Sequence, residues 1–128
     1  DVLVALVDPP GSPLLHKVEH GVLYCDQQQE RSKRRHRYDT ILEGVGCDRL
    51  TANFSRALVD QAFRVSDDEA VEMAHRLLRD EGLFVGGSSG MNVVGALHLA
   101  RQLGPGHTIV TLLCDSGHRY LSSVFASS

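Results

Sequence analysis

Two turns rich in glycine and serine are the segments of this chain whose residue types could hold a ligand. One spans residues 86–90, Gly-Gly-Ser-Ser-Gly, and the other spans residues 115–117, Asp-Ser-Gly. Each follows an apolar segment and precedes residues that favour a helix. A strand that runs through a tight turn into a helix places backbone N–H groups and small hydroxyls at the carboxyl edge of a parallel sheet, where α/β proteins bind ligands. Both turns are therefore candidate ligand sites.

Two known phosphate-binding patterns do not fit the glycines of this chain. A Walker A loop needs a lysine after its last glycine, and Met91 stands there. The segment Gly44-Val45-Gly46 begins like a dinucleotide fingerprint, but Arg49 occupies the position of the third glycine. The sequence therefore disfavours a P-loop and a nicotinamide dinucleotide site. The structural alternative is that the glycines serve turn geometry while the serines cap helices.

A further candidate for chemistry is His16-Lys17-Val18-Glu19-His20, which matches H-x-x-E-H, the pattern of inverted zinc peptidases. A helix here is expected to be short, because Pro13 precedes the segment and Gly21 follows it. A third protein ligand would have to come from downstream, with Glu69 or Glu72 available. We interpret the segment as a surface helix turn without a metal, and a zinc hydrolase stays as an alternative function.

The basic residues are concentrated in one segment. Five of the thirteen lie within residues 31–37, while the whole chain carries a net charge of −3. Residues 27–37 contain no apolar side chain, and no aromatic side chain is interleaved there that could stack on a base. The segment is therefore interpreted as a polar, basic surface loop, and no nucleic-acid partner is expected.

The elements that position these residues alternate between strand and helix. An apolar strand is expected at 2–8, a proline-rich turn at 8–13 and a short helix at 14–20. A helix is expected at 67–81, since Ser66 and Glu69 form a capping box and Gly82 follows.

The same alternation continues to the second turn. Residues 83–85 are expected to resume as strand, and Ser89 is expected to cap a buried helix that Gly104 ends. Residues 108–114 form another apolar run with β-branched side chains and are expected to be a strand. Strand, helix and strand in this order predict a right-handed crossover in a parallel sheet. The predicted fold class is α/β, a three-layer parallel sheet with flanking helices.

Length and composition set further bounds. The chain has 128 residues but begins with Asp1 and enters an apolar strand at once, so we expect a fragment of a longer protein. No apolar run approaches the roughly 20 residues of a membrane helix, and no membrane partner is expected. Three cysteines without C-x-x-C spacing favour reduced thiols. The expected compartment is the cytoplasm, with the mitochondrion as the alternative.

Several ordered motifs resemble one family over nearly the whole chain. They are Asp-Pro-Pro-Gly-Ser at 8–12, Glu-Gly-Val-Gly at 43–46, Glu-Gly-Leu-Phe-Val-Gly-Gly-Ser-Ser-Gly at 81–90, and Asp-Ser-Gly-His-Arg-Tyr-Leu-Ser at 115–122. Together they resemble the carboxyl-terminal part of the cysteine synthase and cystathionine β-synthase family, which comprises fold type II pyridoxal-phosphate enzymes. Segment 27–37 and the phrase at 104–117 are similar to the fungal cysteine synthase-like branch. The resemblance implies that residues 1–128 are a partial C-terminal, larger domain of such an enzyme.

The resemblance implies a role for individual residues. Ser116 matches the serine whose hydroxyl bonds the pyridine nitrogen of pyridoxal 5′-phosphate, and Asp115 is its neighbour that orients the turn. Gly44, Val45 and Gly46 match a loop whose small residues let the backbone approach cofactor and substrate. Cys47 is expected in the substrate pocket. A neutral hydroxyl on the ring nitrogen suits β-elimination and replacement.

The resemblance also implies what this chain lacks. The family forms a Schiff base through a lysine in a Ser-x-Lys context, and neither Lys17 nor Lys33 has that context. We therefore assign no catalytic residue in this chain and expect it to be inactive alone. The parent is expected to convert O-acetylserine, or a similar activated serine, and sulfide into cysteine, as a homodimer with a small amino-acid substrate. A non-catalytic binding or regulatory relative of the same fold is the alternative.

Overall fold

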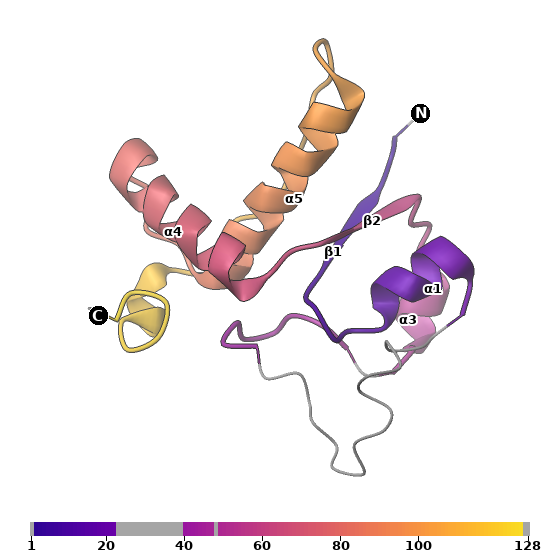
Figure 1. Ribbon diagram of the computed structural model, residues 1–128, viewed down its shortest axis with the longest axis horizontal. Helices are drawn as coiled ribbons and strands as arrows, with labels where there is room; N and C mark the ends of the chain where they lie inside the picture. The colour runs from indigo at the N-terminus through magenta and orange to yellow at the C-terminus, as the bar shows by residue number, and fades with distance from the viewer. Residues whose placement is uncertain (1, 23–39, 48, 127–128) are drawn as a thin grey trace.

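A pair of parallel strands with helices on both sides forms the centre of the fold. The computed structural model describes residues 2–22, 40–47 and 49–126. Strand β1 (Ala5–Asp8) pairs with β2 (Gln61–Arg64), and the register aligns Ala5 with Gln61 and Asp8 with Arg64. Figure 1 shows α1 and α3 on one side of the strand pair and α4 and α5 on the other. The helices span α1 (Leu14–His20), α3 (Ala52–Ser55), α4 (Asp67–Glu81) and α5 (Gly87–Leu103), and a 3-10 helix, η1, spans Gly117–Tyr120.

Parallel pairing and flanking helices confirm the α/β class. Within the described part of the chain the sheet has two strands. Two clusters of buried apolar side chains lie around α4 and α5. One joins Leu42, Val65, Ala70, Met91 and Val94, and the other joins Ala74, Tyr120 and Val124. None of the described helices has the length and apolar character needed to cross a membrane.

The helices with local start and stop signals form where the sequence predicted them. Helix α1 covers 14–20 and closes at Gly21, whose φ of 73° is left-handed. Helix α4 covers 67–81 with both hydrogen bonds of the capping box between Ser66 and Glu69, and it ends at Gly82. The box also lowers the pKa of Glu69, because the carboxylate accepts from the Ser66 backbone and hydroxyl. Both predictions are confirmed.

The predicted role of Ser89 is wrong. Helix α5 begins at Gly87 with Gly86 as its N-cap, so Ser89 lies inside the first turn. Its buried hydroxyl instead accepts a hydrogen bond from the Cys114 backbone N–H at 2.8 Å. Helix α5 ends at Gly104, as expected. The Ser89 hydroxyl therefore bonds a residue distant in sequence and does not cap the helix.

Three predicted strands differ from the structure. The strand expected over 2–8 starts only at Ala5, and residues 83–85 contribute one antiparallel bridge, from Val85 to Ser116. Residues 108–114 form no strand, and Val110 is 86% exposed. A strand exists only with a hydrogen-bonded neighbour, and among the described residues none lies beside 108–114. The predicted crossover through these segments is therefore not formed.

Some predictions lie outside the described residues. The loop at 27–37 with its basic run, Cys25 and Lys33 belong to this group. The other two cysteines, Cys47 and Cys114, are free thiols as expected.

Candidate functional site

Ser116 lies exposed at the start of a short helix, in the capping position that the structural alternative gives to the serines of the two turns. It is the N-cap of η1, and its hydroxyl accepts from the backbone N–H of His118 at 3.4 Å. The same oxygen lies 2.8 Å from Nδ1 of His118. The ring of His118 packs against Phe84, with centroids 4.7 Å apart. The Ser116 hydroxyl is therefore held in one place while staying open to solvent.

Asp115 ties this turn to the start of α5. Its carbonyl accepts from the Gly86 N–H at 2.9 Å, and its carboxylate Oδ2 accepts from the Tyr120 hydroxyl at 2.5 Å. The other carboxylate oxygen, Oδ1, is buried without a hydrogen-bond partner among the described residues. A Cβ added at Gly86 would meet Tyr120 Cε2 at 2.5 Å and Asp115 Oδ1 at 2.7 Å, so glycine is needed for this close approach. The turn and the helix start thus form one packed unit.

The loop with Gly44, Val45 and Gly46 lies against the turn that follows β1. Gly44 and Gly46 have φ of 73° and 74°, the left-handed region that favours glycine. A Cβ at Gly46 would also meet Pro9 Cγ at 2.9 Å, whereas one at Gly44 would meet nothing within 4 Å. Gly44 therefore offers open space beside an exposed backbone.

Cys47 is held by its backbone. Its N–H donates to the Ser12 hydroxyl at 3.2 Å, and that hydroxyl lies 3.4 Å from the Cys47 carbonyl. The Cys47 thiol donates to the Arg49 carbonyl at 2.9 Å, and the residue is half-buried. The loop end is thereby fixed to Ser12, and the thiol is directed at the chain's own backbone.

The loop and the turn flank the first residues of α5. A Cβ at Gly87 would clash with Leu42 from the loop side and would contact Val124 at 3.3 Å. The hydrogen bond to Asp115 and then burial raise the pKa of the Tyr120 hydroxyl, and the charge of Glu43, beside Gly44, raises it further. The two predicted segments are therefore brought to the same end of one helix, although they lie about seventy positions apart in the chain.

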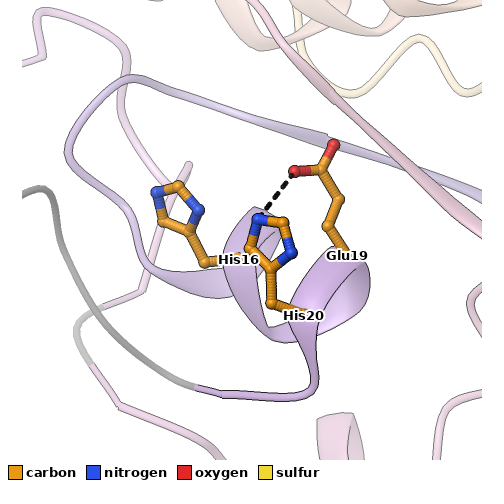
Figure 2. Close-up of side chains that lie close together, drawn as sticks. All are labelled: His16, Glu19 and His20. Atoms are coloured by element: carbon orange, nitrogen blue, oxygen red, sulfur yellow. Dashed lines mark ion pairs between the residues drawn. The ribbon is translucent and has the colours of Figure 1, made fainter.

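The predicted metal-binding pattern on α1 lies elsewhere. His16, Glu19 and His20 project from one helix and approach one another (Figure 2), with ligand atoms all within 4.8 Å. Glu69 and Glu72, which the sequence offered as a downstream ligand, instead line a cavity of about 180 Å³ between α4 and α5 together with His98. A zinc hydrolase that recruits those acids is not supported by this placement.

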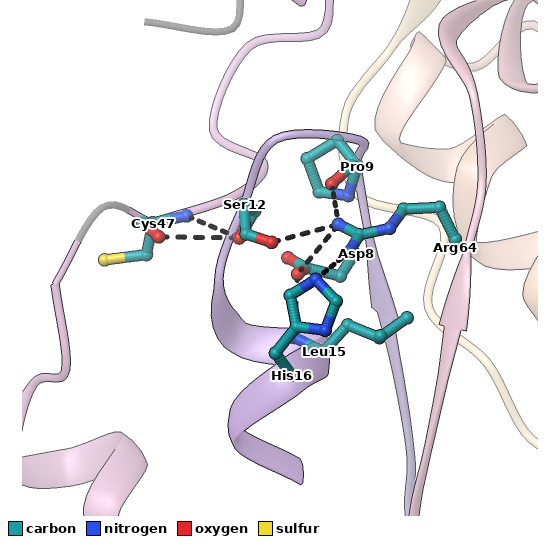
Figure 3. Close-up of polar contacts among 7 residues, drawn as sticks. All are labelled: Asp8, Pro9, Ser12, Leu15, His16, Cys47 and Arg64. Carbon is teal, nitrogen blue, oxygen red and sulfur yellow. Dashed lines mark hydrogen bonds and ion pairs between the residues drawn. The ribbon is translucent and has the colours of Figure 1, made fainter. Parts of the chain in front are cut away.

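A buried ion pair links β1, β2 and α1, as Figure 3 shows. Asp8 is 1% exposed, and its Oδ2 accepts from the Leu15 N–H at 2.9 Å and lies 3.7 Å from Arg64 Nη1. Arg64 Nη1 also donates to the carbonyls of Pro9 and Ser12, at 2.7 and 2.9 Å. Because Ser12 holds Cys47, this cluster fixes one wall of the candidate site.

No role was predicted for Arg64, His118 or Tyr120 from the sequence. His118 and Tyr120 lie within the Asp-Ser-Gly-His-Arg-Tyr motif, so their proximity to Ser116 was a usable signal. Arg64 gave no such signal, since its partner Asp8 is 56 residues away.

The bond from Tyr120 to Asp115 predicts an alkaline limit to stability. This hydrogen bond, and then burial, raise the pKa of the Tyr120 hydroxyl, because the phenol must stay protonated to donate. Its contribution is fully present below the unfolded pKa of about 10 and is lost as the pH rises through the higher folded value. Tyr120→Phe should therefore cost about 1 kcal/mol at neutral pH and progressively less in alkali. Guanidinium melts of both forms across this range measure the difference, and a constant difference would contradict the assignment.

Comparison with known proteins identifies the class to which this fold and site belong. Residues 1–115 match the family described as pyridoxal-phosphate dependent enzyme, and the chain belongs to this family. The chain is 54% identical over 126 residues to cysteine synthase 2 of Schizosaccharomyces pombe. The matched segment covers 97% of this chain and 32% of that protein. It is 50% identical over 126 residues to a cysteine synthase of Dictyostelium discoideum, covering 96% of the chain and 32% of the relative.

A solved structure shows the same arrangement. The O-acetylserine dependent cystathionine beta-synthase from Helicobacter pylori superposes with a TM-score of 0.72 at 27% identity, over 95% of this chain and 34% of that one. The family and the fold type II class expected from the motifs are confirmed. The chain spans about a third of the length of the curated relatives named above.

Proposed function

We propose that this chain is a part of the large, C-terminal domain of a pyridoxal-phosphate dependent cysteine synthase. The whole protein would replace the acyl group of O-acetylserine, or of a similar activated serine, with sulfide to give cysteine. The observation that carries the proposal is the exposed, anchored hydroxyl of Ser116, in a chain that is about half identical to cysteine synthases. The partners that follow are a small amino-acid substrate and a second copy in a homodimer. The cytoplasm remains the expected compartment and the mitochondrion its alternative.

The donors present at the site fit the pyridine side of the cofactor. Ser116 offers a neutral hydroxyl at the edge of the molecule, and Gly44 leaves open space where a side chain would otherwise stand. When bound, pyridoxal phosphate supplies an electron sink for chemistry at the substrate's α-carbon, and a neutral partner at its ring nitrogen limits that sink to elimination and replacement. Ser116 would hold the ring nitrogen, and Gly44, Val45 and Gly46 would contact cofactor and substrate.

The neighbours of Ser116 decide where its proton points. When His118 carries its proton on Nδ1, it donates to the Ser116 oxygen and leaves the hydroxyl proton for the ring nitrogen. Asp115 and Tyr120 hold the turn that carries Ser116. Cys47 would line the substrate pocket, with its position set by Ser12. These residues would bind and orient, and none of them replaces the lysine that the chemistry requires.

The Schiff-base lysine is expected outside this chain. Lys17 lies on α1, where its ammonium donates to the Gly21 carbonyl at 2.6 Å, and α1 lies on the side of the strands away from α4 and α5 (Figure 1). The chain by itself should therefore have no cysteine synthase activity.

Ser116→Ala in the whole protein tests this proposal. We expect kcat for cysteine formation to fall about a hundredfold, as when one preorganised donor is removed. We also expect the cofactor absorbance, at about 410 nm, to shift, because the ring nitrogen loses its partner. Ser116→Thr keeps a hydroxyl and should recover both, and the exposed Ser122→Ala serves as the matched control.

Two outcomes would contradict the proposal. A whole protein that gains no absorbance with added cofactor would favour a non-catalytic relative of the fold. A normal cofactor spectrum and normal turnover in Ser116→Ala would mean that Ser116 does not contact the cofactor, while the assignment to the family would still hold.

A further inference from the structure

Helix α1 gathers two histidines and a glutamate that the proposed function does not use. The rings of His16 and His20 stack with centroids 5.9 Å apart and planes 18° from parallel, as expected for residues four apart on a helix. Glu19 Oε2 lies 3.7 Å from His20 Nε2, and Figure 2 shows the three side chains on one side of the helix. Their ligand atoms are all within 4.8 Å of one another.

This donor set selects a class of metal ion. Two imidazole nitrogens and one carboxylate oxygen suit Zn²⁺ and Cu²⁺, whereas Mg²⁺ and Ca²⁺ prefer oxygen ligands alone. Metal–ligand bonds of about 2.0–2.1 Å place neighbouring ligand atoms about 3.3 Å apart in a tetrahedral site. The observed spacing therefore has to close by at most about 1.5 Å, which rotation of side chains can supply because Glu19 and His20 are exposed.

The backbone beneath these ligands is fixed. Leu14 and Leu15 are each 7% exposed, so the first turn of α1 is anchored in the interior. The Leu15 N–H donates to buried Asp8, and Gly21 closes the helix. A helix that is held in this way keeps the i, i+4 spacing of the two histidines, and binding does not have to order it first.

The charges around the cluster allow a cation. Arg64 Nη2 lies 3.4 Å from His16 Nε2, so the metal would take the other nitrogen of that ring, Nδ1. Nδ1 is buried, so the His16 ring would have to move as the ion binds. The charge of Arg64 is opposed by Asp8, at 3.7 Å, and its stronger hydrogen bonds go to the Pro9 and Ser12 carbonyls. Glu19 supplies a negative charge to the cluster itself.

We propose that His16, Glu19 and His20 form a three-ligand binding site for a divalent transition-metal ion, Zn²⁺ in the first place, with water as the remaining ligand. Glu19 is a ligand here and not a base, so the site clamps α1 and does not hydrolyse. It is independent of the cofactor chemistry proposed for Ser116. Bound zinc would raise the thermal stability of the protein, because the folded helix binds it and the unfolded chain does not hold the three ligands together.

The test is a zinc titration of the whole protein, with any affinity tag removed, against a chromophoric chelator at one fixed, near-neutral pH. The protein should bind one equivalent of zinc per chain. His20→Ala should bind zinc at least about tenfold more weakly, and Glu19→Gln should weaken zinc binding as well. His107→Ala, an exposed histidine remote from the cluster, should not change the titration.

Further readouts decide the proposal. Zinc should raise the melting temperature of the wild type and of His107→Ala but not of His20→Ala. Cu²⁺ should bind more tightly than Zn²⁺, and Mg²⁺ should have no effect. Identical titrations and melts for wild type and His20→Ala would overturn the site, as would an equal loss in His107→Ala.

Discussion

Replacing Gly90 with alanine is expected to destabilise the protein by about 3 kcal/mol, near the upper end of the usual cost of overpacking. Gly90 faces α4 from the first turns of α5, and an added Cβ would collide with the backbone carbonyl of Ala70 and lie 3.1 Å from the Ala74 N–H. Both alanines are fully buried, and backbone atoms inside a helix cannot rotate away as a side chain could. The helices would have to separate, which opens the core around Met91 and Val94.

This expectation opposes the ordinary effect of the substitution. In an exposed helix, alanine in place of glycine stabilises by about 1 kcal/mol through lower backbone entropy in the unfolded chain. Guanidinium unfolding of Gly90→Ala, with the exposed Gln102→Ala on the same helix as control, distinguishes the two. A Gly90→Ala protein as stable as the wild type would mean that Gly90 does not lie in contact with the backbone of α4 at Ala70 and Ala74.

Helices of this chain could be predicted where the signals for them are local. The Ser66 and Glu69 box and the glycines at 21 and 82 each act within one turn, so they place the ends of α1 and α4 without knowledge of the rest of the fold. The N-cap role of Ser116 is equally local and is also confirmed.

Strands and long-range contacts could not be predicted in the same way. Residues 108–114 have the composition of a buried strand, but composition does not supply a neighbouring strand. Ser89 has the right type for a cap, yet its hydroxyl bonds Cys114, 25 positions away. The two halves of the site meet at Gly86 and Gly87 for the same reason, through contacts that only the folded chain brings together.

Replacing Arg64 with alanine is expected to destabilise the protein by about 3 kcal/mol, the largest loss expected from a residue in this wall of the site. Asp8 is almost fully buried, and the guanidinium is the countercharge near its carboxylate. Removing one member of a buried pair leaves an uncompensated charge, which typically costs about 3–5 kcal/mol. We expect the lower end, because Arg64 is 28% exposed and water can partly replace it.

The conservative variant separates charge from geometry. Arg64→Lys keeps the charge but loses the rigid, planar guanidinium that aims Nη1 at both the Pro9 and Ser12 carbonyls, so it should recover only part of the loss. Arg101→Ala, exposed at the end of α5, should be nearly neutral. The double variant Asp8→Asn with Arg64→Ala should cost less than the sum of the singles, because the neutral amide no longer needs a countercharge.

The same substitution should reach the proposed cofactor site through Ser12. Arg64 holds the Ser12 carbonyl, and the Ser12 hydroxyl holds the Cys47 backbone, so the loop with Gly44 and Gly46 should loosen when the guanidinium is removed. In the whole protein, Arg64→Ala should release pyridoxal phosphate more readily on dialysis than Arg101→Ala. Unchanged cofactor retention together with lowered stability would mean that the ion pair supports the fold but does not position this loop.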